Sequence, residues 1–261
     1  MNRILYEPGE CVKGVVIFRK EKARHIRQVL RAGAGDYLKV GEIDGPMGTG
    51  RILNVSSNEV CVAVVPEALP RKPSVDLLLA LPRPKVLKRL IPQIAALGVG
   101  QLFLTNASRV ERPYFDTHVL EPETMRALLL EGLTQAGDTL LPKVRVVRRL
   151  KVFLEDELHA CVDAEERLLL HPHGGDPLFH ALHAGQARSS RVLLAVGPEG
   201  GWVPFELELF EKTGFRRVGV THRVLRSDTA CVAALAAVAM RGDARPGCRP
   251  GEPAGKKLKD P

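Results

Sequence analysis

The sequence predicts an α/β protein in which a small β-rich domain precedes a larger domain built on a parallel sheet. Runs rich in β-branched residues occur in the first part of the chain, and a proline-rich linker follows at Pro66–Pro73. Beyond the linker, apolar strands alternate with helical stretches, a pattern typical of parallel sheets covered on both faces. We therefore expect domains at residues 1–69 and 70–240. Residues 241–261, rich in Pro, Gly and Lys, are expected to be a disordered basic tail.

In the first domain, residues rich in β-branched side chains predict strands at Val12–Phe18 and Val60–Val65. Between them, residues 23–31 have a helical pattern with apolar residues on one face. A strand is expected near residues 37–40. Residues 45–51 are interpreted as a hairpin turn, because they lack the spacing of a phosphate-binding loop. The helix also carries three cations, Arg24, Arg27 and Arg31. A charge run of this kind is most often a solvated helix face.

The predicted second domain starts with a buried strand at Val75–Leu81 and a helix at Lys85–Leu97, in which Pro92 is expected to produce a kink. Leu102–Thr105 is the next strand, and Glu121–Gln135 reads as an amphipathic helix. The pattern is weaker from 144 to 190. Strands are expected there near residues 144–147, 160–163 and 167–170, with a helix near 176–184.

The clearest pattern in the chain lies between residues 191 and 240. A buried strand at Val192–Val196 stops at a Gly-Pro-Glu-Gly-Gly turn, where glycine permits backbone angles that side chains forbid. Then a helix at 204–213, a strand at 217–220, a loop and a helix from Ser227 to Met240 are expected, the last capped by Ser227 or Asp228. The two loops would leave the same ends of two neighbouring strands, which is where open α/β sheets bind ligands.

Composition narrows the class of protein. The chain has 261 residues, 45% of them hydrophobic, and a formal net charge of +8, which suits a polyanionic partner such as RNA. Its five cysteines are scattered without a CxxC pair, which argues against a disulfide framework and for a reducing compartment. No apolar run approaches the ~20 residues that span a bilayer, and no signal-peptide pattern is present. The sequence therefore predicts a cytoplasmic protein.

Four histidines could suggest a metal site: His171, His173, His180 and His183. No carboxylate or cysteine accompanies them at a spacing typical of metal ligands. We therefore predict no metal.

Two motifs near the C-terminus carry a family resemblance. GPEGG at 197–201, followed by RVLRSDTA at 223–230, closely resembles the paired motifs of the bacterial small-subunit ribosomal RNA uracil-N3 methyltransferases, a family of the SPOUT class. The segment at 25–31, followed by Gly35-Asp36, resembles that family's N-terminal PUA-like RNA-binding domain. Residues 105–109 resemble a serine-x-arginine segment of its active site.

The resemblance implies a fold, a reaction and an assembly. We expect a PUA-like β-barrel domain at 1–69 and a trefoil-knotted SPOUT domain at 70–240, in a homodimer with the site at the subunit interface. The enzyme would transfer a methyl group from S-adenosyl-L-methionine to N3 of a uridine in ribosomal RNA of the small ribosomal subunit.

The resemblance also assigns residues. The cofactor-binding set is Leu194, Gly197, Pro198, Glu199, Gly200, Gly201, Val220, Thr221, His222, Val224, Leu225, Arg226 and Thr229. The catalytic pair is Arg226 and Arg109, because guanidinium groups stabilise the anion that develops on the uracil oxygens. The RNA-binding set is Arg24, Arg27, Arg31, Arg83, Lys85, Lys88 and Arg89, since cations pair with phosphates.

Three departures from the family pattern leave alternatives open. Thr221-His222 replaces a Leu-Gly pair, Asp228 replaces Glu, and Asp138 stands where an arginine is expected. The alternatives are a non-catalytic RNA-binding protein with a degenerate site and a SPOUT methyltransferase that acts on another RNA. A third is an ordinary doubly wound hydrolase or dehydrogenase, although the GxGxxG fingerprint of dinucleotide binding is absent.

Overall fold

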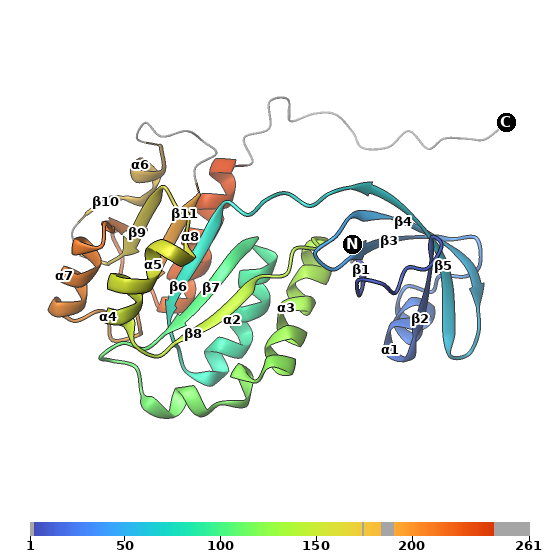
Figure 1. Cartoon of the computed structure of the whole chain (residues 1–261), viewed down its shortest axis with the longest axis horizontal. Coiled ribbons are helices and arrows are strands. Elements are labelled where there is room, and N and C mark those ends of the chain that lie inside the picture. The colour runs from blue at the N-terminus through green and yellow to red at the C-terminus, as the bar shows by residue number, and fades with distance from the viewer. Residues whose placement is uncertain (1–2, 174, 184–190, 243–261) are drawn as a thin grey trace.

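The computed structural model describes residues 3–173, 175–183 and 191–242, and shows two sheets that lie side by side (Figure 1). The α/β class and the order of the two parts are as predicted. From residue 243 onward, the expected tail at 241–261 lies outside the described residues, while Arg241 and Gly242 belong to the last helix. No helix in the described part of the chain is long and apolar enough to cross a membrane.

The N-terminal part is a five-stranded sheet in the order β1-β3-β4-β5-β2. Its core consists of buried aliphatic and aromatic side chains such as Val16, Phe18 and Val62. Its elements are β1 (Ile4–Tyr6), β2 (Val15–Arg19), α1 (Lys20–Arg24) with a π-helical turn at His25–Val29, β3 (Tyr37–Glu42), β4 (Met47–Val55) and β5 (Glu59–Ala68).

One prediction for this part was wrong. Residues 45–51 are a turn only up to Pro46, because Met47 already starts β4. Gly50 lies inside that strand, where a Cβ atom would come within 2.4 Å of the Val62 side chain. The glycines therefore serve close packing across the sheet as well as the turn.

The C-terminal part is built on a seven-stranded, all-parallel sheet in the order β10-β12-β9-β11-β6-β7-β8. Strands β6 and β11 occupy its centre and are buried along their whole length. The strands are β6 (Val75–Ala80), β7 (Val99–Thr105), β8 (Lys143–Val147), β9 (Glu166–Leu170), β10 (Asp176–Pro177), β11 (Val192–Val196) and β12 (Arg216–Gly219).

Helices pack on this sheet. Helix α2 contacts both α3 and α8, and α8 also contacts the central strands β6 and β11. The helices are α2 (Pro84–Ala96), α3 (Pro122–Ala136), α4 (Leu150–Val152), α5 (Leu158–Cys161), α6 (Leu178–His183), α7 (Pro204–Lys212) and α8 (Ser227–Gly242), with 3₁₀ turns at Arg112–Asp116 and His118–Leu120 and a π-helical turn at Phe153–Glu157.

Two predictions for the second domain were wrong. The expected strand at 160–163 does not form: residues 160–161 end a continuous helical segment of α4, the π-helical turn and α5, and 162–163 are neither helix nor strand. The segment buries Phe153, Leu154 and Leu158. The strands at 192–196 and 217–220 are also not neighbours, because β9 pairs with both and lies between them. Their loops still leave the same edge of the sheet, since all three strands are parallel.

The two sheets are joined through the segment that follows α3. Arg3 donates to the Gly137 carbonyl at 2.9 Å, and Arg126 binds both Glu7 carboxylate oxygens at 2.6 and 2.7 Å. Asp138 belongs to this junction: its Oδ1 accepts from the Thr139 amide at 2.6 Å and from the Leu140 amide at 3.3 Å. Its departure from the family pattern thus shapes the turn that seats the first domain.

Candidate active site

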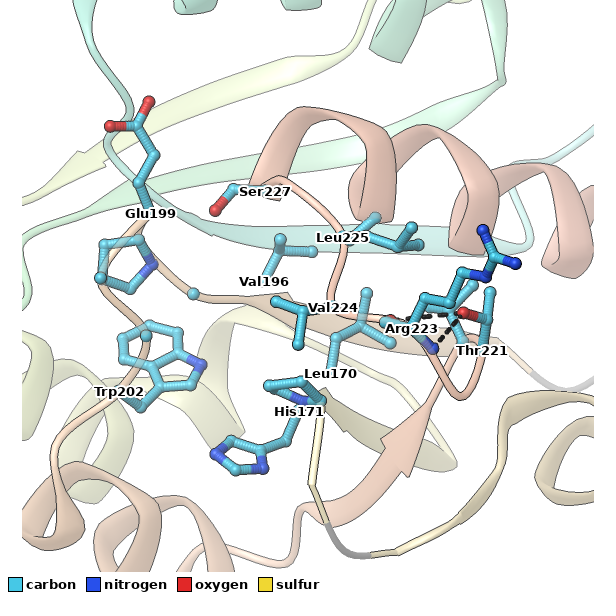
Figure 2. Close-up of a pocket in the computed structure, with 17 residues that line it drawn as sticks. Leu170, His171, Val196, Glu199, Trp202, Thr221, Arg223, Val224, Leu225 and Ser227 are labelled. Atoms are coloured by element: carbon cyan, nitrogen blue, oxygen red, sulfur yellow. Dashed lines mark hydrogen bonds between the residues drawn. The ribbon is translucent and has the colours of Figure 1, made fainter.

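A pocket of about 200 Å³ opens at the carboxyl ends of β9, β11 and β12 (Figure 2). Its interior is largely apolar, and Figure 2 shows the Val196, Leu170 and Val224 side chains gathered in it. The lining residues are Leu170, His171, Pro172, Val196, Gly197, Pro198, Glu199, Gly200, Gly201, Trp202, Val220, Thr221, Arg223, Val224, Leu225, Ser227 and Ala230.

The Gly-Pro-Glu-Gly-Gly loop forms one wall of this pocket, with its backbone exposed to it. A Cβ at Gly197 would lie 2.8 Å from the Trp202 indole nitrogen, so only glycine fits against that ring. Gly201 has φ +76°, a conformation that L side chains rarely adopt. Gly197, Gly200 and Gly201 line the pocket without side chains, so backbone forms this part of the wall.

A buried carboxylate anchors the glycine loop to the loop that follows β7. Glu206 is 4% exposed, and its two oxygens accept from the Ser108 amide at 2.7 Å and the Val203 amide at 2.9 Å. Arg109 then reaches back and donates to the Gly200 carbonyl. Arg109 and the glycine loop are thereby placed side by side, as the resemblance to an active-site segment implied. Glu206 had no signal in the sequence beyond its place at the start of a helix.

The second motif forms the opposite wall. Thr221 Oγ1 accepts from the Arg223 amide at 2.8 Å, which closes a tight turn where the family has Leu-Gly. Val224 is 71% exposed at the mouth, while Ser227 is buried where α8 begins. The Asp228 carboxylate at the start of α8 makes two interactions. It binds the Arg89 guanidinium at 2.5 Å and accepts a hydrogen bond from the Thr229 amide at 2.9 Å.

The floor of the pocket comes from the end of β9, a strand that the sequence predicted at 167–170 but did not assign to the site. Leu170, His171 and Pro172 follow β9, which lies between the strands that carry the two motifs. The imidazole Nδ1 of His171 lies 2.5 Å from the His173 carbonyl oxygen. A Leu-His-Pro sequence at a strand end was available as a signal, but only the strand order brings it between the motifs.

The structure brings most of the proposed cofactor-binding residues together. Nine of them line the pocket: Gly197, Pro198, Glu199, Gly200, Gly201, Val220, Thr221, Val224 and Leu225. Four do not line it: Leu194, His222, Arg226 and Thr229. Leu194 is fully buried inside β11, and the side chains of His222, Arg226 and Thr229 are exposed. Arg226 is the residue immediately before α8.

A second, more polar pocket adjoins the first at the carboxyl ends of β6 and β7. It is lined by Leu81, Pro82, Arg83, Arg109, Glu111, Tyr114, Pro198, Glu199 and Gly200. Arg83 Nε lies 3.2 Å from Glu199 Oε2, and Tyr114 donates to Glu111 at 2.7 Å. Hydrogen bonding to Tyr114 and the Glu199 charge raise the pKa of Arg83, so this guanidinium stays protonated.

The proposed RNA-binding residues form two groups, one in each domain. On the first domain, Arg24 and Arg31 are exposed, whereas Arg27 is half-buried. On α2 and the residue before it, all four cations are exposed, but Arg83 and Arg89 form ion pairs with Glu199 and Asp228. Lys85 and Lys88 have no ion-pair partner among the described residues.

Within the described residues, no group of three or more His, Cys, Asp or Glu side chains is placed to hold a metal ion. His171 and His173 contact each other edge to face, with ring centroids 6.1 Å apart. His183 stacks on Phe179 instead, with centroids 4.3 Å apart.

Comparison with known proteins supplies the family. A family model described as an RNA methyltransferase domain matches residues 70–239. The ribosomal RNA small subunit methyltransferase E of Treponema pallidum is 33% identical over 245 residues, which cover 91% of this chain and 90% of that protein. The protein of the same name from Bacillus subtilis is 26% identical over 236 residues, which cover 85% of this chain and 91% of that protein.

The solved structures agree at the level of the fold. The crystal structure of a ribosomal RNA small subunit methyltransferase E from Neisseria gonorrhoeae, bound to S-adenosyl methionine, has a TM-score of 0.73 to this chain at 19% identity. The similarity covers 92% of this chain and 97% of that one. The chain therefore belongs to the SPOUT-class RNA methyltransferase family that includes the ribosomal RNA small subunit methyltransferase E proteins.

Proposed function

We propose that this protein transfers a methyl group from S-adenosyl-L-methionine to N3 of a uridine in the ribosomal RNA of the small subunit. The observation that carries the proposal is the joint pocket of the two motifs: the glycine loop and the 221–225 turn face each other across one cavity. The names of the relatives support the same substrate class, and one relative was crystallised with S-adenosyl methionine.

The pocket fits such a cofactor by its shape and chemistry. The glycine loop lines the pocket with backbone atoms, which can pair with the polar atoms of a nucleoside or an amino acid. Leu170, Val196 and Leu225 supply apolar contacts for a flat base. When bound, the cofactor supplies a methyl group on a positively charged sulfur, and the chain's residues have to align the acceptor with it.

The same proposal assigns the remaining residues. Of the cofactor set, Leu194, His222, Arg226 and Thr229 would act from outside the pocket lining, by supporting its walls. Arg226 and Arg109 are proposed to stabilise the negative charge that develops on the uracil oxygens as N3 loses its proton. Arg24, Arg27 and Arg31 on the first domain, and the cations of 83–89, are proposed to contact RNA phosphates.

Three further features belong to the proposal. Residues 1–69 form a PUA-like RNA-binding domain and 70–240 the methyltransferase domain. The latter is trefoil-knotted, with the segment after β12 threaded through a loop of the chain. The enzyme is a homodimer with its site at the subunit interface, and it works in the cytoplasm on the small ribosomal subunit.

Two measurements test the proposal. Calorimetric titration should show S-adenosylmethionine binding at one site per chain. Single-turnover reactions with small ribosomal subunits, followed by nucleoside mass spectrometry, should then yield N3-methyluridine. Cofactor binding with methylation of a different RNA would support the alternative substrate. RNA binding without cofactor binding would make the chain a non-catalytic RNA-binding protein.

A further inference from the structure

The polar pocket beside the cofactor pocket has the features of a site for the base that is methylated. The two pockets share Pro198, Glu199 and Gly200, so they lie on the two sides of one loop. Figure 2 shows the Glu199 side chain extending away from Trp202 and His171, which lie deeper in the cofactor pocket. We propose that the polar pocket receives the flipped-out uracil and that Glu199 accepts its N3 proton. This inference rests on the proposed function.

The hydrogen-bonding groups around Glu199 match the edge of uracil. The Arg83 guanidinium lies on one side of the carboxylate, with Nε 3.2 Å from Oε2. Arg109, which also lines the pocket, donates to the carbonyl of the next residue, Gly200. The pocket thus holds two guanidinium donors and one carboxylate acceptor. Uracil presents the complement, with two carbonyl acceptors flanking the N3–H donor, whereas cytosine presents an amino donor and an unprotonated N3.

An aromatic side chain completes the pocket. Tyr114 lines it and is held by a hydrogen bond from its hydroxyl group to Glu111 at 2.7 Å. This bond and burial raise the pKa of Tyr114, so the phenol stays neutral. Proteins that act on a base take it out of its stack and place it in a pocket, often against an aromatic ring. Tyr114 supplies such a ring beside the two guanidinium groups.

The chemical step is then balanced within this site. The N3 lone pair attacks the methyl carbon, an N–C bond forms, and the S–C bond breaks to leave a neutral thioether. The N3 proton passes to the Glu199 carboxylate and from there to water. Negative charge that develops on the uracil oxygens faces Arg83 and Arg109 of this pocket, whereas Arg226 lines neither pocket and would act on that charge from outside them.

Several charged or titratable groups line the two pockets together with Glu199. In the polar pocket these groups are Arg83, Arg109, Glu111 and Tyr114, and across the cofactor pocket they are His171 and Arg223. Arg83 is the group in direct contact with Glu199.

The test is Glu199→Gln, which keeps the shape of the side chain and removes its basicity. The matched control is Glu208→Gln, the same change on the exposed face of α7. Single-turnover methylation of small ribosomal subunits should fall by about 10²-fold or more in Glu199→Gln, the range for loss of a general base. Calorimetry should show S-adenosylmethionine affinity within about threefold of the unmodified chain in both variants, less than 1 kcal/mol.

Two readouts separate proton transfer from a structural role. The loss of methylation rate in Glu199→Gln should shrink by about tenfold or more as the pH rises toward the ionisation of the uracil N3–H, because a general base is then needed less. It should also shrink with RNA that contains 5-fluorouridine, since fluorine withdraws electrons and acidifies the N3–H. A loss of methylation rate in Glu199→Gln that is the same at every pH and with 5-fluorouridine would overturn the role of Glu199 as the base. A methylation rate equal to that of the unmodified chain would overturn it as well.

The outcomes also distinguish this inference from the proposed function. If the unmodified chain makes N3-methyluridine and Glu199→Gln shows the expected pH-dependent loss of rate, the proposed function and the inference are both supported. An unmodified chain that makes N3-methyluridine with a fully active Glu199→Gln variant overturns the inference alone. An unmodified chain that methylates no uridine overturns the proposed function, and the inference with it.

Discussion

Gly197 has no space for a side chain, because its neighbour Trp202 cannot move away. The indole contacts the Phe210 ring with centroids 4.8 Å apart, and Phe210 in turn contacts Phe215 at 4.9 Å. All three rings are buried at 5% exposure or less. A tightly packed cluster of this kind transmits any added volume to the backbone of the glycine loop. The glycine loop therefore keeps its shape only if residue 197 has no side chain beyond a hydrogen atom.

Gly197→Ala should weaken S-adenosylmethionine binding by about tenfold or more, in line with an overpacking cost of ~1–3 kcal/mol. The added Cβ would meet the indole nitrogen at 2.8 Å and force either the ring or the loop to shift. Calorimetric titration measures the affinity, and circular dichroism verifies that the variant is folded. Gly33→Ala is the control, since its Cβ would meet one atom at 4.0 Å. Unchanged affinity in a folded Gly197→Ala protein would show that the cofactor does not rest on this loop.

Arg226→Lys should lower the single-turnover rate by about 10²-fold and change cofactor affinity much less, as expected for loss of a transition-state donor. Lysine keeps the charge but lacks the planar donors of a guanidinium. Arg216→Lys is the control, because Arg216 begins β12 at the opposite edge of the sheet. Equal losses of rate and affinity would make Arg226 a binding residue. If neither the rate nor the cofactor affinity falls, Arg226, whose side chain is exposed, has no role in the site.

At the scale of elements, α2 connects the two motifs. Arg83, immediately before the helix, binds Glu199 of the glycine loop, and Arg89, one and a half turns into it, binds Asp228 at the start of α8. The four-cation cluster predicted for RNA therefore has two members that hold the walls of the pocket together. Helix α2 also contacts α8 directly, so the ion pairs add to a packed interface.

The Arg89–Asp228 pair should contribute about 0.2–1 kcal/mol, because Arg89 is 64% exposed although Asp228 is only 19% exposed. We expect Arg89→Ala and Asp228→Ala each to lower cofactor affinity less than tenfold. A double-mutant cycle on denaturant unfolding and on cofactor affinity isolates the pairwise term. The coupling should decrease in high salt. Additive effects of the two substitutions would mean that the pair stabilises neither the fold nor the pocket.

At the scale of the whole molecule, two groups of exposed cations lie on two domains that are joined by specific contacts. The Arg126–Glu7 ion pair and the hydrogen bond from Arg3 to Gly137 hold the first domain against α3 and the residue that follows it. We propose that this chain, with a net charge of +8, contacts the phosphates of one RNA from both domains. The relative position of the domains matters because these contacts must be made together.

RNA affinity should fall steeply with salt, and the slope should report the number of phosphates contacted. Removing Arg24 and Arg31, or Lys85 and Lys88, should each reduce the slope of log K against log salt by about 0.7–0.9 per lost contact. Lys212→Ala, on the exposed end of α7, is the control. Filter binding with ribosomal RNA fragments between low and physiological salt measures the slope. An affinity that does not change with salt would rule out phosphate contacts as the basis of binding.

Local patterns in the sequence determined the kinds of elements and the family. Apolar runs specified β6 and β11, and helical periodicity specified α2 and α3 within a few residues, because side-chain burial on one face or on both is encoded locally. The two motifs also predicted nine residues that line the pocket. Strand order was not encoded locally, since any parallel strand can pair with several others.

Tertiary structure alone decided how these elements meet. The insertion of β9 between the motif strands placed His171 on the floor of the pocket. A helical segment that ends at Cys161 replaced part of the strand expected at 160–163, and it buries Leu154 and Leu158, four residues apart as on one face of a helix. The pairing of Arg83 with Glu199 joins residues 116 positions apart (199 minus 83), a contact that no local pattern contains. Long-range contacts form through the balance of packing and charge across the whole fold, and for that reason the polar pocket could be recognised only in three dimensions.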